Sequence, residues 1–320
     1  MAKQKNPTIR QWIDTVKPVA FWILILAIAY QFANAILVHY VFFPSEMFHP
    51  LHRATGGIIH ATFQGYVLLT IVTGFFICYL GGLRAKDFAL FSKKILPAIG
   101  LTLFAWGMIH TIPFLEGRAL QINSDWDTLE AARHRFSEFF MSQLFGNALY
   151  EELFFRAFLI SQLTLFFLKK MTSTPAILFA IICSCIIFAL VHIPAWLING
   201  TSIEVILLED LPGFFLRGLA YVVIFLLTKN IFVAVGIHAL SNASPDIFAN
   251  IGQNREREFV VVLLIYFFLR WCYRKWRKVE VENADTTGYK CMLITLSLVV
   301  VFSWSIIVAM RSLLEGFYIT

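Results

Sequence analysis

The sequence predicts an all-α protein whose helices cross a membrane several times, because it is rich in apolar residues, poor in charge and divided into long apolar segments. Of its 320 residues, 59% are hydrophobic and only 14% are charged, and the mean hydropathy is +0.73. Soluble domains average about 45–50% apolar and about 25% charged residues. A globule of this length cannot bury the excess, whereas a bilayer can surround it. The 33 phenylalanines and 8 tryptophans favour lipid-facing helices with aromatic residues at the interfaces.

Seven clear apolar segments and two weaker ones account for the expected helices. A spanning helix needs about 20 apolar residues, so we expect a polytopic transmembrane helical bundle of about 8–9 spans. The fourth segment is too long for one simple span, and its first part, up to about Asn147, is expected to be an amphipathic helix at the interface. In chain order the segments are 18–43, 57–80, 95–115, 136–168, 175–197, 211–228, 231–251, 259–273 and 291–314.

Basic residues concentrate in alternate loops, which predicts the orientation of the bundle. By the positive-inside rule the N-terminus is expected in the cytoplasm. A sequence pI near 9.1 would suggest nucleic acid as a partner of a soluble protein, but basic loops between apolar segments indicate a lipid bilayer and no nucleic acid. Segments on the N-terminal side carry Lys3, Lys5, Arg10, Lys17, Arg84, Lys86, Lys93, Lys94, Lys169, Lys170, Lys229, Arg270, Arg274, Lys275, Arg277, Lys278 and Lys290, whereas the opposite segments carry Arg53, Arg118, Arg133, Arg135, Arg255, Arg257 and Arg311.

One apolar segment contains two adjacent carboxylates and an arginine, Glu151, Glu152 and Arg156. Each ionisable group in a membrane costs about 2.5–3.5 kcal/mol, which makes such groups functional candidates. On a helix, Glu152 and Arg156 share a face and can form an ion pair. Glu151 points about 140° away from Arg156. It is therefore left to find a partner on another helix, where it can act as a general base.

Two further polar motifs lie on later apolar segments. Phe188 and His192 are four residues apart, and Pro194 predicts that the helix bends or ends there. His238 and Asn242 have the same spacing, so they could donate two hydrogen bonds to one oxygen, as an oxyanion hole requires. Taken singly, each motif also fits a purely structural role, as an ion pair, a hydrogen-bonded interior histidine or an interhelical amide contact. Their occurrence on three helices favours a shared site.

These motifs resemble the three signature motifs of the CAAX protease and bacteriocin-processing family, also called the Abi family. The order and spacing of Glu151-Glu152-x-x-x-Arg156, Phe188-x-x-x-His192 and His238-x-x-x-Asn242 agree with that pattern, as do Phe214-Phe215-x-Arg217-Gly218 and the turn at 228–230. We expect N-terminal transmembrane helices in 1–136, a catalytic core in 137–250, formed by the fourth to seventh spans, and C-terminal transmembrane helices in 251–320. All three parts would form a single membrane domain.

The resemblance implies hydrolysis of a peptide bond in a membrane-associated protein or peptide. Glu151 would activate water with help from His192, and His238 and Asn242 would stabilise the oxyanion. Glu152 and Arg156, together with Phe188, would organise the site. Family distribution points to the inner membrane of a bacterium. Eukaryotic relatives of this kind point to prenylated CAAX proteins as substrates, and bacterial ones to peptide maturation, signal-peptide processing or sorting tails.

The same residues allow a zinc site as an alternative. Glu151, His192 and His238 could supply three zinc ligands. Glu151 would then be a ligand and no other obvious base would remain, so a mechanism without a cofactor is favoured.

Two other functions stay open at the level of sequence. A non-catalytic membrane protein, such as a bacteriocin-immunity or scaffold protein, could share the fold, since fold does not fix function. A proton-coupled transporter could also use buried Glu, His and Arg, although no pair of corresponding broken helices in two halves indicates transporter repeats.

Overall fold

The structure is a computed structural model that describes residues 12–42, 45–115, 129–243, 260–266, 268 and 296–297. Helices and turns make up the described residues, which contain no strand, so the predicted all-α class is confirmed. Among the described residues, four helices are long and apolar enough to cross a membrane, namely Phe21–Phe42, Ala61–Leu80, Ser173–Ile198 and Ile203–Thr228. Two shorter apolar helices are Ile95–Thr111 and Ile231–Asn242. The predicted segments 259–273 and 291–314 lie almost wholly outside the described residues.

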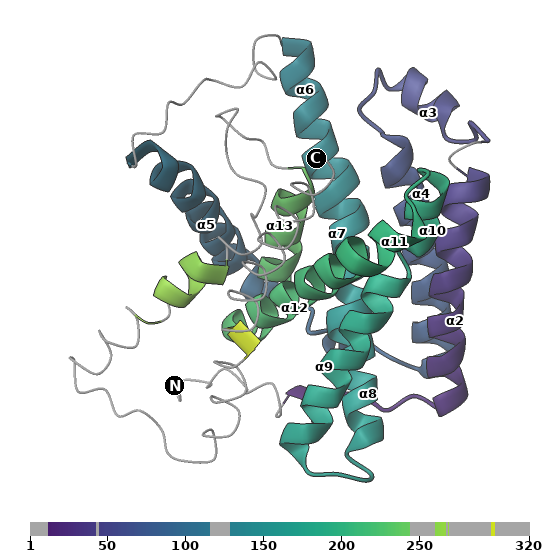
Figure 1. Cartoon of the computed structure of the whole chain (residues 1–320), viewed down its shortest axis with the longest axis vertical. Coiled ribbons are helices and arrows are strands. Elements are labelled where there is room, and N and C mark those ends of the chain that lie inside the picture. Colours follow the sequence, from purple (N-terminus) through teal and green to yellow (C-terminus); the bar gives the residue numbers. More distant parts are fainter. Residues whose placement is uncertain are drawn as a thin grey trace, which may run out of the picture.

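The first helices form one side of the bundle. The helix α2 (Phe21–Leu37) runs on into η1 (Val38–Phe42), and α4 (Ala61–Gly74) runs on into η2 (Phe75–Leu80). The short elements α3 (His49–Ala54), η3 (Ala85–Phe88) and η4 (Ser92–Lys94) connect these helices to the rest. The longer helix α5 (Ile95–Leu115) follows. Figure 1 shows α2 and α4 at one edge of the molecule and α5 at the other. Many large side chains of α2, η2 and α5 are exposed, as expected of helices that face lipid.

A helical rod without a break covers residues 129–167 and carries the first polar motif. It consists of α6 (Leu129–Ser137), η6 (Glu138–Asn147), α7 (Ala148–Glu151), η7 (Glu152–Leu159) and α8 (Ile160–Phe167). The helix expected up to about Asn147 is part of this rod, because the backbone continues without a break from α6 into the buried α7. The reason lies in packing, since η6 lies against α4 and α13 and buries Ser142 and Gly146. Both η6 and η7 have wide π-type turns, which occur frequently at functional sites.

The next helices complete the bundle with α9 (Ser173–Leu190), α10 (Ile193–Ile198), α11 (Ile203–Val205), η8 (Ile206–Asp210), α12 (Leu211–Thr228) and α13 (Ile231–Asn242). The bend predicted at Pro194 is confirmed, because α9 ends at Leu190 and Pro194 lies in the first turn of α10. The sixth segment begins at Ile203 rather than at 211. Ser202 caps it by accepting from the amide of Val205, so the helix starts before the acidic residues that lower its hydropathy.

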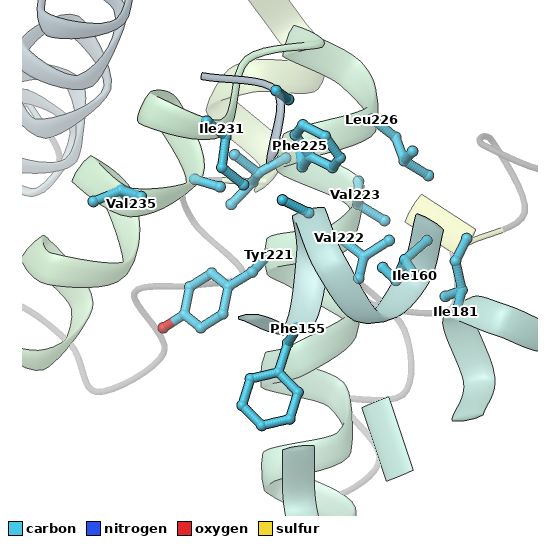
Figure 2. Packing of buried hydrophobic residues seen from close by; sticks show 14 of the residues in the cluster. Phe155, Ile160, Ile181, Tyr221, Val222, Val223, Phe225, Leu226, Ile231 and Val235 are labelled. Carbon is cyan, nitrogen blue, oxygen red and sulfur yellow. The ribbon is translucent and has the colours of Figure 1, made fainter. Parts of the chain in front are cut away.

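The helix α12 lies at the centre, between α9 and α13 (Figure 1). Every residue from Gly218 to Leu226 is buried, and Figure 2 shows Val222, Val223 and Leu226 packed beside Ile160 and Ile181. In a bilayer the hydrophobic effect gives helices little reason to associate, so close packing through small residues matters more. Gly236 of α13 illustrates this, because a Cβ there would lie 2.7 Å from Oγ1 of Thr102 on α5.

The turn between α12 and α13 fixes the position of α13 on the bundle. Asn230 caps α13 by accepting from the amide of Phe232, and its Nδ2 donates to the carbonyl of Lys94 at 2.8 Å. Nζ of Lys94 donates in return to the carbonyl of Lys229. This pair of contacts joins the start of α5 to the start of α13, the helix that carries His238.

Candidate active site

Three predicted site residues from three parts of the chain meet around the carboxylate of Glu151. Glu151 is the last residue of α7, His192 lies in the turn between α9 and α10, and His238 lies in α13. Nε2 of His192 is 3.9 Å from Oε1 of Glu151, and Nε2 of His238 is 3.7 Å from Oε2. Each carboxylate oxygen therefore faces one imidazole. All three residues lie within the bundle, with 8% of the Glu151 side chain and 22% of the His192 side chain exposed.

The second carboxylate, Glu152, joins two helices. Its Oε2 lies 3.2 Å from Nε of Arg156, which confirms the ion pair predicted from their spacing. Its Oε1 lies 2.8 Å from Nδ1 of His238, a contact that the sequence did not predict. Both Glu152 and Arg156 are fully buried. The contact between them has the distance of an ion pair but not the geometry of a hydrogen bond, so the stronger directional contact of Glu152 is the one to His238.

The hydrogen bonds of the two imidazoles decide which nitrogen faces Glu151. Nδ1 of His192 lies 2.7 Å from the carbonyl of Phe188, and a carbonyl can only accept, so Nδ1 carries a proton. Nδ1 of His238 donates to the carboxylate of Glu152 in the same way. In their neutral forms, both residues therefore turn an Nε2 lone pair towards Glu151. The hydrogen bond at Nδ1 holds each ring in place and leaves its Nε2 to face Glu151.

Aromatic side chains hold the rings of the site. Phe188 is buried, its ring centroid is 4.9 Å from that of His192, and the guanidinium carbon of Arg156 lies 4.5 Å from it. Tyr221 of α12 stacks on His238 with 4.1 Å between ring centroids and 18° between planes. Figure 2 shows Tyr221 at the edge of the packed cluster, away from the aliphatic residues. Tyr221 was missed at the level of sequence, although it lies three residues after Gly218 and shares its helix face.

Gly218 lets α12 approach the site closely. A Cβ at this position would lie 3.0 Å from Cδ1 of Phe188, and the Gly218 carbonyl accepts from Nη2 of Arg156 at 3.3 Å. Both contacts need the backbone of α12 to lie directly against the polar cluster. These contacts therefore explain why a glycine stands at the last position of Phe214-Phe215-x-Arg217-Gly218. Arg217 itself stacks on Phe214, with 4.8 Å between its guanidinium carbon and the ring centroid, and Phe214 in turn lies 4.5 Å from the ring of His192.

Asn242 is hydrogen-bonded to η6. Its side chain is exposed, and its Nδ2 donates to Oε1 of Gln143 on η6 at 3.0 Å. Asn147, one turn before Glu151, also donates to Oε1 of Gln143, at 3.5 Å. These amides lie on the faces of η6 and α13 that meet each other. Gln143 was not singled out in the sequence, because an amide two turns before the motif carries no signal of its own.

The proposed zinc ligands do not form a metal-holding group as they stand. Among the residues that the structure describes, no cluster of three or more His, Cys, Asp or Glu side chains meets the geometry for a metal ion. The second carboxylate, Glu152, is already engaged by Arg156 and His238.

Comparison with known proteins assigns the segment that contains these motifs. Residues 135–244 match the family model described as Rce1-like, type II CAAX prenyl endopeptidase Rce1-like. No curated protein and no solved structure matches the chain. The matched segment holds all three motifs, so residues 135–244 are similar to a peptidase family, and the four long apolar helices among the described residues support an integral membrane protein. The resemblance carried by the motifs is thus confirmed, and residues 135–244 are an Rce1-like domain of the CAAX protease and bacteriocin-processing family.

Proposed function

We propose that the chain is an intramembrane endopeptidase in which Glu151 activates the water that cleaves a peptide bond. The observation that carries this proposal is the placement of Glu151, whose two oxygens face Nε2 of His192 and Nε2 of His238 from two other parts of the chain. A carboxylate between two oriented imidazoles can take a proton from water. Substrates would be membrane-associated proteins or peptides.

The reaction follows from the proton positions. The carboxylate of Glu151 accepts a proton from water as the water oxygen attacks the scissile carbonyl carbon. Nε2 of His192 accepts a hydrogen bond from the same water and orients it, because the proton of its Nδ1 is held by Phe188. Glu151 then returns the proton to the amide nitrogen as the carbon–nitrogen bond breaks, which leaves a carboxyl group and an amine.

The developing oxyanion needs hydrogen-bond donors, and His238 is the proposed one. Its Nδ1 already donates to Glu152, so it can donate from Nε2 only when both nitrogens carry protons. Asn242 would add a second donor through the N–H that Gln143 does not use.

Glu152, Arg156 and Phe188 act as positioning residues in this scheme. Glu152 fixes the ring of His238, Arg156 holds Glu152 and the backbone of Gly218, and the carbonyl of Phe188 fixes the ring of His192. In this scheme Glu151 is the base and no cofactor takes part, whereas in the alternative Glu151, His192 and His238 would hold zinc.

The location and direction of the site complete the proposal. We place the protein in the inner membrane of a bacterium, as the family resemblance implies, with its N-terminus in the cytoplasm, as the basic loops indicate. Residues 137–250 would be the catalytic core of a single membrane domain. His192 follows the C-terminal end of α9, so the site would then lie in the outer half of the bundle.

Cleavage by purified protein tests the proposal directly. The substrates are a library of membrane-anchored peptides that includes prenylated CAAX peptides, and the variants are Glu151→Gln and, as a matched control, Glu204→Gln on the exposed start of α11. Loss of a general base lowers turnover by about 10²–10⁴-fold, so Glu151→Gln should lose cleavage while Glu204→Gln keeps it.

Each protein is also assayed with a chelator and after addition of zinc. Cleavage that is lost in Glu151→Gln and indifferent to the chelator supports the glutamate mechanism. Cleavage lost on chelation and restored by zinc would replace it with a metal mechanism on the same residues. Full activity of a folded Glu151→Gln variant would reject the assigned role of Glu151.

A further inference from the structure

A second polar region lies at the end of the bundle where α6 begins. A cavity of about 380 Å³ is lined by residues of α3, of the turn that follows it and of α6. Figure 1 shows α3 and α6 at the same end of the molecule. The size falls in the range of about 300–1,000 Å³ that is typical of ligand pockets. The described lining residues are His52, Arg53, Gly56, Gly57, Ile58, His134 and Ser137.

The lining of this cavity is basic. His52, Arg53 and His134 can each carry a positive charge, and no acidic residue lines the cavity in the part of the chain that the structure describes. His60 stands behind them, with its ring centroid 5.3 Å from that of His52 and 6.4 Å from that of His134. The pKa of His60 is lowered by burial first and then by His52 and His134, whereas Glu138 raises it. A bound anion would relieve this repulsion between like charges.

The groups that face His60 come from three elements. Its neighbours are His52 of α3, His134 of α6 and Glu138 of η6. Glu138 is paired with Arg135 at 3.4 Å between Oε2 and Nη1, so its charge is offset. The cluster as a whole therefore becomes net positive when its histidines take up protons.

One imidazole nitrogen of the cavity wall lacks a partner. Nδ1 of His52 is buried and forms no hydrogen bond among the described residues. The turn beside it is built from Gly56 and Gly57, with φ of 57° and 85°, a conformation that glycine adopts without strain. A Cβ on Gly57 would be in ordinary van der Waals contact with Cε1 of His52, at 3.7 Å, so that ring lies against the turn. A buried ring nitrogen without a partner indicates a ligand on that side.

The residues around the cavity indicate which kind of molecule would bring an anionic group into it. His60 directly precedes the candidate span Ala61–Leu80, so the cavity lies where a span ends. Met47, Leu51 and Ile58 are large apolar side chains beside it, and each is exposed. A lipid can contact the basic cavity and the apolar side chains together, because its headgroup is charged and its chains are apolar.

We propose that this cavity binds the phosphate group of an anionic lipid headgroup, with His52, Arg53 and His134 supplying the positive charge. The proposal does not depend on peptide cleavage by the protein.

Lipid retention tests it on the full chain. The purified protein is placed in phosphatidylcholine bilayer discs with increasing phosphatidylglycerol, and retained lipid is counted by native mass spectrometry. The double variant Arg53→Gln/His134→Gln is compared with Lys169→Gln, an exposed lysine of the turn after α8. Each basic residue removed should lower retention of phosphatidylglycerol by about fivefold, whereas Lys169→Gln should retain it like the wild type. Retention should also be stronger at pH 5.5 than at pH 7.5.

Inorganic phosphate is the second probe, and it distinguishes a lipid headgroup from free phosphate as the ligand. If phosphate protects the wild type but not the double variant against thermal unfolding, the cavity is a phosphate site. If phosphate also displaces phosphatidylglycerol, the cavity binds the lipid headgroup. Protection by phosphate without retention of phosphatidylglycerol would overturn the lipid assignment. Equal retention in the double variant and the wild type, or an equal loss in Lys169→Gln, would overturn the site.

Discussion

The molecule contains two groups of histidines that differ in how their rings are held. In the candidate active site, His192 and His238 each have Nδ1 hydrogen-bonded, to the Phe188 carbonyl and to Glu152. In the basic cavity, Nδ1 of His52 has no such partner among the described residues, and its ring contacts that of His60 edge-on. Burial also differs, since His238 is 2% exposed whereas His134 is largely open to solvent.

This difference shows that the partner of a histidine, rather than the residue itself, indicates its task. A ring with one nitrogen fixed offers the other nitrogen in a defined direction, as a reaction requires. A ring without a fixed nitrogen can change its protonation with pH and bind a ligand that is not always present. The predictions that follow separate the two regions by the size and kind of effect.

The largest expected effect on stability is that of Arg156→Met. Removing one partner of a buried ion pair leaves an uncompensated charge and costs about 3–5 kcal/mol. Arg156 is 1% exposed and holds both Glu152 and the Gly218 carbonyl. The measurement is unfolding in detergent, with Arg53→Met as the matched control from the cavity. The exposed Arg53 should change stability by no more than about 0.5 kcal/mol, and equal effects of both substitutions would break the comparison.

A smaller loss is expected from Gly218→Ala. The added Cβ would meet the ring of Phe188 at 3.0 Å, and overpacking of this kind costs about 1–3 kcal/mol. Gly213→Ala is the control on the same helix, because nothing lies within 4 Å of a Cβ there. Thermal unfolding should show Gly213→Ala at or above the wild type, since alanine favours a helix. Two variants of equal stability would mean that α12 does not press on Phe188.

The smallest expected effect concerns the pH dependence contributed by His60, which lies one residue before a candidate span. Burial and the neighbouring His52 lower its pKa in the folded protein below the usual value of 6.5. The unfolded chain therefore binds the proton first as the pH falls. The stability due to this group is fully present above about pH 6.5 and is lost as the pH falls through the lower folded pKa.

His60→Asn should therefore flatten the dependence of unfolding temperature on pH below about 6.5. Asparagine is chosen because His60 caps α4 by accepting from the amide of Thr62, and an Asn side chain can do the same. Unfolding is followed in a pH series with wild type and variant side by side. An unchanged slope would show that His60 is already protonated or open to solvent in the folded protein.

The helices themselves were largely predictable, because hydropathy marks a span wherever the residues are apolar. The prediction failed where polar residues belong to a helix. The rod begins at Leu129, ahead of the predicted fourth segment 136–168, and the sixth helix begins at Ile203, ahead of Glu204, Glu209 and Asp210. Caps and tertiary packing decide such ends, and neither leaves a strong mark in hydropathy.

Within the site, contacts along one helix were predictable and contacts between helices were not. The pair of Glu152 and Arg156 follows from a spacing of four residues. The bond from His238 to Glu152 and the stacking of Tyr221 depend on how α12 and α13 are rotated about their axes. The same rotation turns Asn242 towards Gln143. Periodicity gives the face of each helix but not which faces meet.

The stack of Tyr221 on His238 has a consequence for spectroscopy. With the two rings 4.1 Å apart and nearly parallel, the carbon-bound protons of His238 lie in the shielding region of the phenol ring current. Their resonances should therefore appear upfield of those of an ordinary histidine. They would form a reporter that needs no label in the substrate, and a return to ordinary positions would show that α12 and α13 have moved apart.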